Sequence, residues 1–208
     1  TVIPAGEGVL TTVLFIDPGY DEICFDVVTM SDSNAQPMNF DLGDCYETDI
    51  FIVTQEIPIS ALSMNLVSFM STPENAAASS VFGDNDILIA SNDGGQYYAP
   101  NFGVDLIGDM DFTRGYNLFL TGTADQTIVV EGIPFDLDET SVSVGALQNN
   151  IIGYLPTECM ATEYIFEQYD NILIVKDDSG NYYAPNFGVA ILDEMCPGEG
   201  YEIFLTGT

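Results

Sequence analysis

The sequence lacks histidine and tryptophan, and it has almost no positive charge. Arg114 and Lys176 are its only basic residues, against 33 aspartates and glutamates, so the formal net charge is -31. Phosphate groups are bound mainly through lysine and arginine, so this balance excludes nucleic-acid binding and disfavours binding to anionic membranes. Ion pairs can satisfy very few of the carboxylates. The repulsion among the rest must be relieved by dissolved salt or bound cations.

Two further absences narrow the function classes. The sequence contains no apolar run of about 20 residues, the length that a membrane-spanning helix needs. Without histidine, and with one lysine and one arginine, chemistry could rest only on carboxylates, serine, tyrosine and cysteine. Among 33 acidic residues, pairs at the separation used by glycosidases arise by chance. We therefore predict that the protein is not an enzyme.

Hydrophobic residues, by contrast, are plentiful. They make up 47% of the chain and include 13 phenylalanines and 11 tyrosines. This content distinguishes the chain from a disordered acidic tail and is sufficient for genuine cores. A length of 208 residues suits one to three small domains.

An internal repeat dominates the sequence. The octet YYAPNFGV occurs at Tyr97–Val104 and again 85 positions later, at Tyr182–Val189. Without gaps, residues 86–123 and 171–208 are identical at 21 of 38 positions. Tandem repeats are typical of modular building and not of a single catalytic centre.

The repeat divides the chain into three predicted parts. Residues 51–123 and 124–208 are the two repeat units, and residues 1–50 match neither. Within the first 50 residues, the β-branched and aromatic runs Thr11–Ile16 and Ile23–Thr29 flank a turn and predict a β segment. That segment is interpreted either as an immunoglobulin-like piece or as a strand donated to another subunit.

The four cysteines are interpreted with the help of the repeat. Cys159 and Cys196 align with Glu74 and Asp111 of the first unit, so that unit lacks both. Two cysteines that are present together in one unit and absent together from the other predict a Cys159–Cys196 disulfide. Cys24 and Cys45 would then form a second one. Four separate buried thiols are the alternative. A zinc site is disfavoured because the sequence has neither Cys-x-x-Cys nor histidine. Two disulfides imply an oxidising, extracellular compartment.

The predicted fold class is mainly β: tandem small β-rich modules with about one short helix each, preceded by the N-terminal β segment. Each unit contains a hairpin signal, with a Gly-rich or Ser-Gly turn after Ile87–Ala90 and after Ile172–Val175. A helix start is predicted at Thr72-Pro73, and a short helix is predicted within Thr157–Gln168.

The octet itself is predicted to do structural work. Neighbouring strand residues point to opposite faces, so Tyr97 and Tyr98 cannot both face the core. We predict Tyr98 and its counterpart Tyr183 as partner contacts, stacking on a sugar or on a neighbouring subunit. Packing in the core or simple exposure is the alternative. Pro100 is expected to end strand pairing, and Phe102 to fill the core.

Acidic residues in the turns favour calcium as the one cofactor. Carboxylates there can combine with main-chain carbonyl groups as hard oxygen ligands, although no EF-hand pattern is present. The alternative is that these turns use aspartate for their own hydrogen bonds. The predicted metal-binding residues are Asp84, Asp86, Asp93, Asp177 and Asp178.

Three stretches of the second unit carry a resemblance: N-I-I-G-Y, then I-L-I-V-K-D-D-S-G-N-Y-Y-A-P-N-F-G-V, then P-G-E-G-Y-E-I-F-L. In this order they resemble a module repeated in large secreted and surface proteins of Bacteroidetes-type marine bacteria and in fibre-like proteins of marine phages. The likeness extends to both units and covers over half of the chain. Where the family has tryptophan, this chain has Met64 and Asn149. The resemblance implies an extracellular structural or adhesive role and supplies no catalytic residues.

The sequence thus predicts an extracellular structural repeat protein. It would be a subunit or segment of a surface filament or fibre, assembled by self-association through contacts between β modules. The alternatives are an adhesin or carbohydrate-binding module of a larger secreted protein, with glycans as partners, or a segment of a phage fibre.

Overall fold

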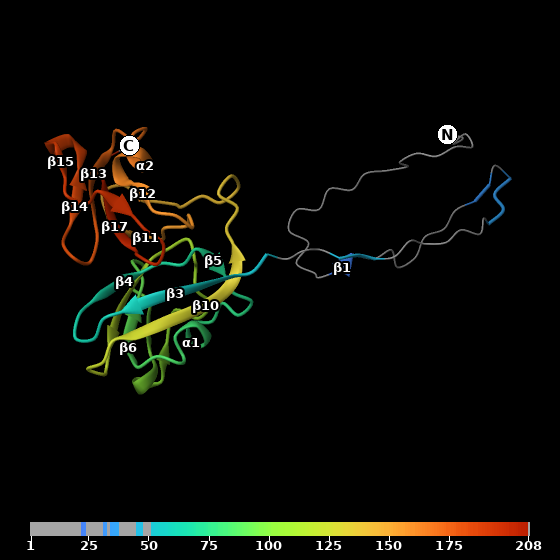
Figure 1. Ribbon diagram of the computed structural model, residues 1–208, viewed down its shortest axis with the longest axis horizontal. Coiled ribbons are helices and arrows are strands. Elements are labelled where there is room, and N and C mark those ends of the chain that lie inside the picture. Colours follow the sequence, from blue (N-terminus) through green and yellow to red (C-terminus); the bar gives the residue numbers. More distant parts are fainter. Residues whose placement is uncertain (1–21, 24–30, 33, 38–44, 48–50, 208) are drawn as a thin grey trace. The chain divides into compact units, whose positions relative to one another are not determined.

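The computed structural model describes residues 22–23, 31–32, 34–37, 45–47 and 51–207, in two compact units, Thr1–Phe51 and Ile52–Thr208 (Figure 1). In the first unit, β1 (Glu22–Ile23) pairs antiparallel with β2 (Tyr46–Glu47). The predicted strand at Thr11–Ile16 and residue Cys24 lie outside the described residues. The second unit contains both repeats.

Each repeat contains the same five-stranded antiparallel sheet. The sheet of the first repeat has the order β4-β9-β6-β7-β8, and that of the second has the order β11-β17-β13-β14-β15. The hairpin predicted in each unit is confirmed as β6–β7 and β13–β14. The strands are β4 (Asn65–Val67), β9 (Tyr116–Leu120), β6 (Ile87–Ser91), β7 (Tyr97–Ala99), β8 (Val104–Asp105), β11 (Asn149–Ile152), β17 (Tyr201–Leu205), β13 (Ile172–Lys176), β14 (Tyr182–Ala184) and β15 (Val189–Ala190).

The predicted mainly β class with one short α-helix per repeat is confirmed. The helices are α1 (Ala78–Val81) and α2 (Thr162–Phe166). The helix start predicted at Thr72-Pro73 is wrong, because Ser71–Thr72 form a strand and α1 begins at Ala78. None of the described helices is long and apolar enough to cross a membrane.

The two octets have the same backbone. Each runs from a strand into a short 3-10 helix, η1 (Pro100–Phe102) or η2 (Pro185–Phe187), and then into the next strand. Gly103 and Gly188 end these helices with φ of 64° and 65°, a left-handed conformation that favours glycine. The repeated letters therefore encode one repeated turn.

A second sheet completes the first repeat. It has the order β3-β10-β5, with β3 (Val53–Ile59), β10 (Gln126–Pro134) and β5 (Ser71–Thr72). Along β3 and β10, buried and exposed residues alternate, as expected for a sheet with one face on the core. Ile128 and Val130 of β10 pack into the core of the first repeat. The first repeat therefore extends from β3 through β10, past residue 123. In the second repeat a shorter pair, β12 (Met160–Ala161) and β16 (Glu194–Met195), lies beside α2.

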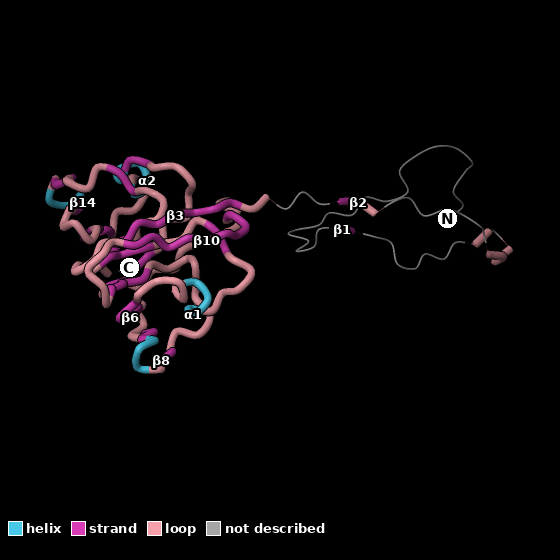
Figure 2. Tube along the Cα trace, turned by 60° about the horizontal axis from the view of Figure 1, so that its bottom comes forward, coloured by secondary structure: helices cyan, strands magenta, loops and turns pink. Residues whose placement is uncertain are grey.

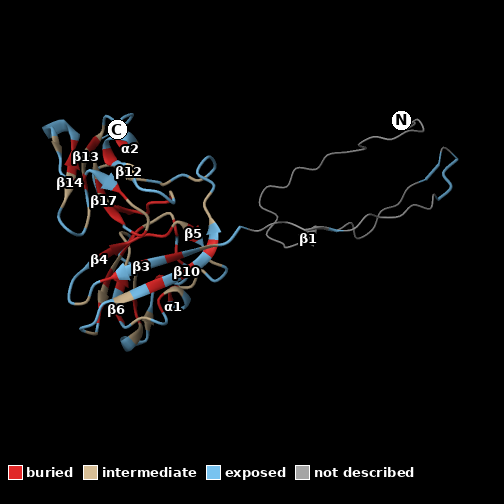
Figure 3. Ribbon diagram, in the orientation of Figure 1, coloured by how far each residue is buried: buried red, intermediate tan, exposed pale blue. Residues whose placement is uncertain are grey.

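The repeats have separate hydrophobic cores, which are the buried segments in Figure 3. Phe69 is fully buried at the centre of the first core, with the ring of Phe112 edge-on at 5.3 Å between centroids. In the second core, Tyr154 and Tyr201 pack in an edge-on arrangement at 6.4 Å.

One tyrosine in each repeat anchors the loop before its own strand. The phenol oxygens of Tyr116 and Tyr201 accept hydrogen bonds from the main-chain N–H groups of Asp111 and Cys196, both at 2.8 Å. Burial raises the pKa of Tyr116 to about 12, and it also raises the pKa of Tyr201, as does the hydrogen bond of this phenol to Glu199. Each ring thus fills the core, while its hydroxyl group accepts a hydrogen bond from a main-chain N–H group of the loop.

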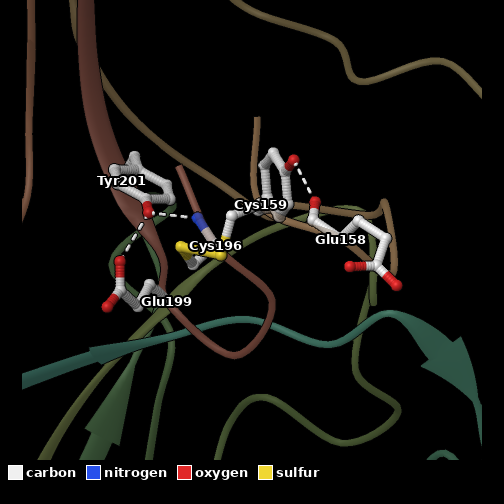
Figure 4. Close-up of a disulfide and its surroundings, with 6 residues drawn as sticks. Glu158, Cys159, Cys196, Glu199 and Tyr201 are labelled. Carbon is white, nitrogen blue, oxygen red and sulfur yellow. Dashed lines mark hydrogen bonds between the residues drawn. A yellow bond between two sulfur atoms is a disulfide. The ribbon is translucent and has the colours of Figure 1, made fainter. Parts of the chain in front are cut away.

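The predicted Cys159–Cys196 disulfide is confirmed (Figure 4). Its cysteines lie next to the paired strands β12 and β16, with their Cα atoms 4.2 Å apart. The phenol group of Tyr201 lies at the same loop, where it donates to a carboxylate oxygen of Glu199 at 2.6 Å. The disulfide joins the segment before β12 to the loop that follows β16. The second predicted bridge includes Cys24 and so lies outside the described residues.

We predict that alkaline pH destabilises the fold through its buried phenols. Burial raises the pKa of Tyr116 and of Tyr154 from 10.0 to about 12. These phenols stay protonated in the folded state while they ionise in the unfolded chain. The free energy of unfolding should therefore be unaffected by them below pH 10, and fall between pH 10 and 12 by at most about 1.4 kcal/mol per pH unit for Tyr116 and by less for Tyr154. Urea titrations across this range measure it, and a constant value would contradict the prediction.

Removal of the disulfide should weaken the second repeat. The two cysteines are 37 residues apart, and closing a loop of that length stabilises a fold by about 4 kcal/mol in the chain-entropy account. The variant Cys159→Ser/Cys196→Ser should lose about 2–5 kcal/mol of unfolding free energy in urea titrations under non-reducing conditions. A loss below about 1 kcal/mol would show that the loop is held by other contacts.

Candidate functional site

The two repeats meet along residues 66–68 and 113–115 of the first and residues 151–153 and 198–200 of the second, and we call this contact the seam. Its hydrogen bonds occur in matched pairs. The N–H of Gly115 donates to the carbonyl oxygen of Ile151 at 3.2 Å, and the N–H of Gly200 donates to that of Leu66 at 2.8 Å. Position 115 corresponds to 200, and 66 to 151, through the 85-residue offset. The same bond is therefore made in both directions.

A second matched pair follows the same rule. Ser68 N–H donates to the carbonyl oxygen of Gly198, and Gly153 N–H donates to that of Thr113, both at 3.0 Å. These bonds place β4 next to the loop before β17, and β11 next to the loop before β9.

A third pair uses the hairpin turns. Oδ2 of Asp93 accepts from Ile151 N–H at 3.2 Å, and Oδ2 of Asp178 accepts from Leu66 N–H at 3.0 Å. Each repeat thus contributes the same surface to the other, so the repeats are related by an approximate internal two-fold axis. Such a self-complementary contact is closed and does not propagate.

The glycines at the seam are required by the close approach of the two main chains. A Cβ atom on Gly115 would lie 2.8 Å from both the carbonyl oxygen of Ile152 and Cγ2 of Ile151. A Cβ atom on Gly200 would lie 2.8 Å from the carbonyl oxygen of Val67. The Gly-Tyr pair shared by the repeats therefore has two functions: the glycine admits the other repeat, and the tyrosine anchors the loop.

Charge breaks the symmetry of the seam. The guanidinium group of Arg114 bonds both carboxylate oxygens of Asp93, at 2.9 and 3.0 Å, and lies 3.3 Å from Asp111. The corresponding residue in the second repeat is Glu199. One end of the seam therefore carries a compact ion-pair cluster, whereas the other end carries Asp178 and Glu199.

Two shallow hollows flank the seam, and Asp93 and Arg114 of the first correspond to Asp178 and Glu199 of the second. The first has a volume of about 440 Å³ and is lined by Asn92, Asp93, Gln96, Arg114, Gln148 and Asn149. The second, of about 310 Å³, includes Ile57, Asn65, Leu66, Asp178, Pro197 and Glu199. Amide and carboxylate groups dominate the first hollow, so it could hydrogen-bond a polar ligand.

The structure uses the predicted metal-binding residues separately. Asp84 is exposed, and Asp86 accepts from the side-chain amide of Gln126 at 2.9 Å. Asp177 accepts from the main-chain and side-chain N–H groups of Asn181, at 2.8 and 2.7 Å. Asp93 and Asp178 bond across the seam. Asp177 thus bonds within its own turn, which was the alternative to calcium binding. Among the described residues, no three acidic or sulfur-bearing side chains are gathered as a metal site.

The predicted partner contacts Tyr98 and Tyr183 face inward, which corrects that prediction. Their rings are buried and pack against Phe82 and Phe166, with centroids 6.3 and 6.2 Å apart. Burial raises the pKa of both phenols. The neighbouring tyrosines at 97 and 182 are the partly exposed members of each pair. Alternation along the strand required one inward ring, but the sequence alone did not show which one.

Phe102 is also placed differently from the prediction. It does not fill the core: both Phe102 and its counterpart Phe187 are 71% exposed. The 3-10 turn that starts at the proline directs the chain, and with it this residue, away from the core.

A second exposed apolar residue was missed by sequence reasoning. Leu62 and Leu147 are each 70% exposed and have φ of 59° and 58°, a left-handed conformation that costs a side chain such as leucine roughly 1–2 kcal/mol. Buried Asn65 and Asn150 hold these loops, each bonding the main-chain N–H and carbonyl groups of the residue five positions earlier. The Ala-Leu pair at the same offset in both repeats was the available signal.

We predict that a methyl group at the seam destabilises the fold. Gly115→Ala or Gly200→Ala should lower the free energy of unfolding by about 1–3 kcal/mol, because the new Cβ atom overlaps main-chain atoms of the other repeat. The matched control is Gly122→Ala, whose Cβ atom would have its nearest neighbour at 3.6 Å. Urea titrations compare the three variants, and equal losses in all of them would refute a steric requirement at the seam.

Comparisons with known proteins do not assign the chain to a family. No protein-family model, no curated protein and no solved structure matches it. The function is therefore inferred from the geometry of the described residues.

Proposed function

We propose that the protein is an extracellular structural repeat protein, a subunit or segment of a surface filament or fibre that assembles through contacts between β modules. The observation that carries this proposal is the reciprocal seam. It fixes the two modules as one block in which the surfaces of the two matching five-stranded sheets are presented twice.

The seam determines how such a block could extend. Both repeats use the same face against each other, so that face is consumed and cannot join the next molecule. The surfaces left over occur in equivalent pairs, as shown by the equal exposure of Leu62 and Leu147, and of Phe102 and Phe187. A block with two equivalent joining surfaces links two neighbours, which is the minimum requirement for a filament.

The charge of the block sets the conditions for assembly. Arg114 is paired with Asp93, and Lys176 with Glu202, so both basic side chains are already engaged within the chain. Two neighbouring molecules of net charge -31 repel each other unless salt or divalent cations screen them. This suits a saline or calcium-containing medium, and the disulfide suits an oxidising one.

We predict that assembly requires screening. At an ionic strength of about 0.01 M, where the Debye length is about 30 Å, the purified chain should remain monomeric. At about 1 M, where it is about 3 Å, the chain should form particles longer than dimers. Analytical ultracentrifugation and electron microscopy provide the measurement, with millimolar calcium compared against sodium chloride of equal ionic strength. A chain that stays monomeric under all these conditions contradicts the proposal.

The second candidate is a glycan-binding module of a larger secreted protein. It is favoured by the first seam hollow, whose amide groups from Asn92, Gln96, Gln148 and Asn149 could hydrogen-bond sugar hydroxyl groups. A chain that remains monomeric at high salt, and binds a glycan array in a way that Gln96→Ala/Asn149→Ala abolishes, would favour this function over the first.

A further inference from the structure

The octet contains a large apolar residue that packs into neither core. Its second tyrosine and its alanine are buried, its proline opens the 3-10 helix, and its glycine takes the left-handed conformation. The asparagine of the second copy donates its side-chain amide to the carbonyl oxygen of Ile172 at 3.1 Å. Phe102 and Phe187 belong to neither core, yet both repeats retain phenylalanine at this position with 71% exposure.

The exposed phenylalanines lie next to unpaired sheet edges. The strand that follows each of them, β8 or β15, is the last strand of its five-stranded sheet. No other strand among residues 51–207 pairs with its outer side. The residue after that strand is again apolar and exposed in both repeats, Leu106 at 53% and Ile191 at 54%. We call residues 102–106 and 187–191 the outer edges.

The two outer edges lie far apart on the folded body. In Figure 2, β8 with its short helix lies at the bottom, whereas β14 and the adjoining helix lie at the upper left. The seam lies between the two sheets, so the outer edges are the ends of the block that point away from each other.

The seam shows how a sheet edge of this module is completed. On the inner side of the first sheet, Val67 of β4 forms a bridge with Glu199 of the other repeat, flanked by the main-chain bonds of Ser68 and Gly200. An equivalent bridge joins Arg114 to Ile152 of β11. Within the chain, a module therefore already joins another copy of itself by pairing main chain at a sheet edge. In the two five-stranded sheets of residues 51–207, the outer edges are the ones left open.

We propose that the outer edges dock onto the outer edges of further copies of this chain. Main-chain N–H and carbonyl groups of β8 or β15 would pair antiparallel with the same groups of a second copy, and the phenylalanine would cover the junction. Another open strand edge is the complement of an open strand edge, and the two five-stranded sheets give each copy two equivalent ones. The inference rests on the proposed function and specifies the surface on which it depends.

The two outer edges differ in charge, which ranks them. β8 contains Asp105, which is exposed, whereas the corresponding residue of β15 is Ala190. Two β15 edges can approach without opposing carboxylates in the strands, so we expect a junction of two β15 edges to be tighter than a junction of two β8 edges.

The test removes the phenylalanine that covers one edge at a time, in the full chain at high salt. Wild type should form particles longer than dimers. Phe102→Ser and Phe187→Ser each keep one edge covered by phenylalanine and should stop at dimers. The Phe102→Ser dimer joins two β15 edges, the tighter junction, so it should dissociate at a lower protein concentration than the Phe187→Ser dimer. The double variant should be monomeric. The matched control is Leu62→Asn/Leu147→Asn, which removes two equally exposed apolar side chains away from the outer edges and should assemble like wild type. Sedimentation velocity gives the sizes, and circular dichroism verifies folding.

The outcomes separate this inference from the proposed function. Wild-type assembly that persists in the Phe102→Ser/Phe187→Ser variant refutes docking at the outer edges but leaves the structural function intact. Loss of assembly in the leucine control, with the phenylalanine variants unaffected, places the junction at the leucine loops and overturns the inference. A wild-type chain that stays monomeric refutes both. Binding of an alternating Lys-Val hexapeptide by that monomer, lost in the double phenylalanine variant, would assign the edges to a cationic strand instead.

Discussion

The close main-chain approach at Gly115 and Gly200 is the constraint on which the rest of the structure depends. Each glycine N–H donates to a carbonyl group of the other repeat, at a separation that leaves no room for a side chain. The tyrosine that follows each glycine holds the preceding loop through its phenol group. The dipeptides Gly115-Tyr116 and Gly200-Tyr201 therefore determine together the position of these loops, the seam and the orientation of both sheets.

The shortage of basic residues explains how the carboxylates are used. In a chain with two cations, aspartates are satisfied mainly by N–H groups. Asp93 and Asp178 accept from main-chain N–H groups across the seam, and Asp177 accepts from both nitrogen atoms of Asn181. Charge-assisted hydrogen bonds of this kind are stronger than bonds between neutral groups. They allow an acidic protein to be held together without a network of salt bridges.

Local features were predictable from the sequence, whereas features that depend on tertiary packing were not. The hairpins, the octet's turn and the Cys159–Cys196 bridge follow from short-range signals and from comparison of the two repeats. The inward position of Tyr98 depends on which face of the sheet meets Phe82, and that face is chosen by distant strands. β10 joins the first core although the repeat alignment placed it after residue 123. The seam could not be foreseen, because its bonds come from main-chain groups that any residue possesses.

The reciprocal seam has a consequence for longer chains built from this module. A third module of the same kind would find the seam faces of the first two already occupied, so it would expose its own glycine-lined face to solvent. A fourth module could cover that face. Arrays of this module are therefore expected to be stable in even numbers, with the folded pair as the unit that is gained or lost.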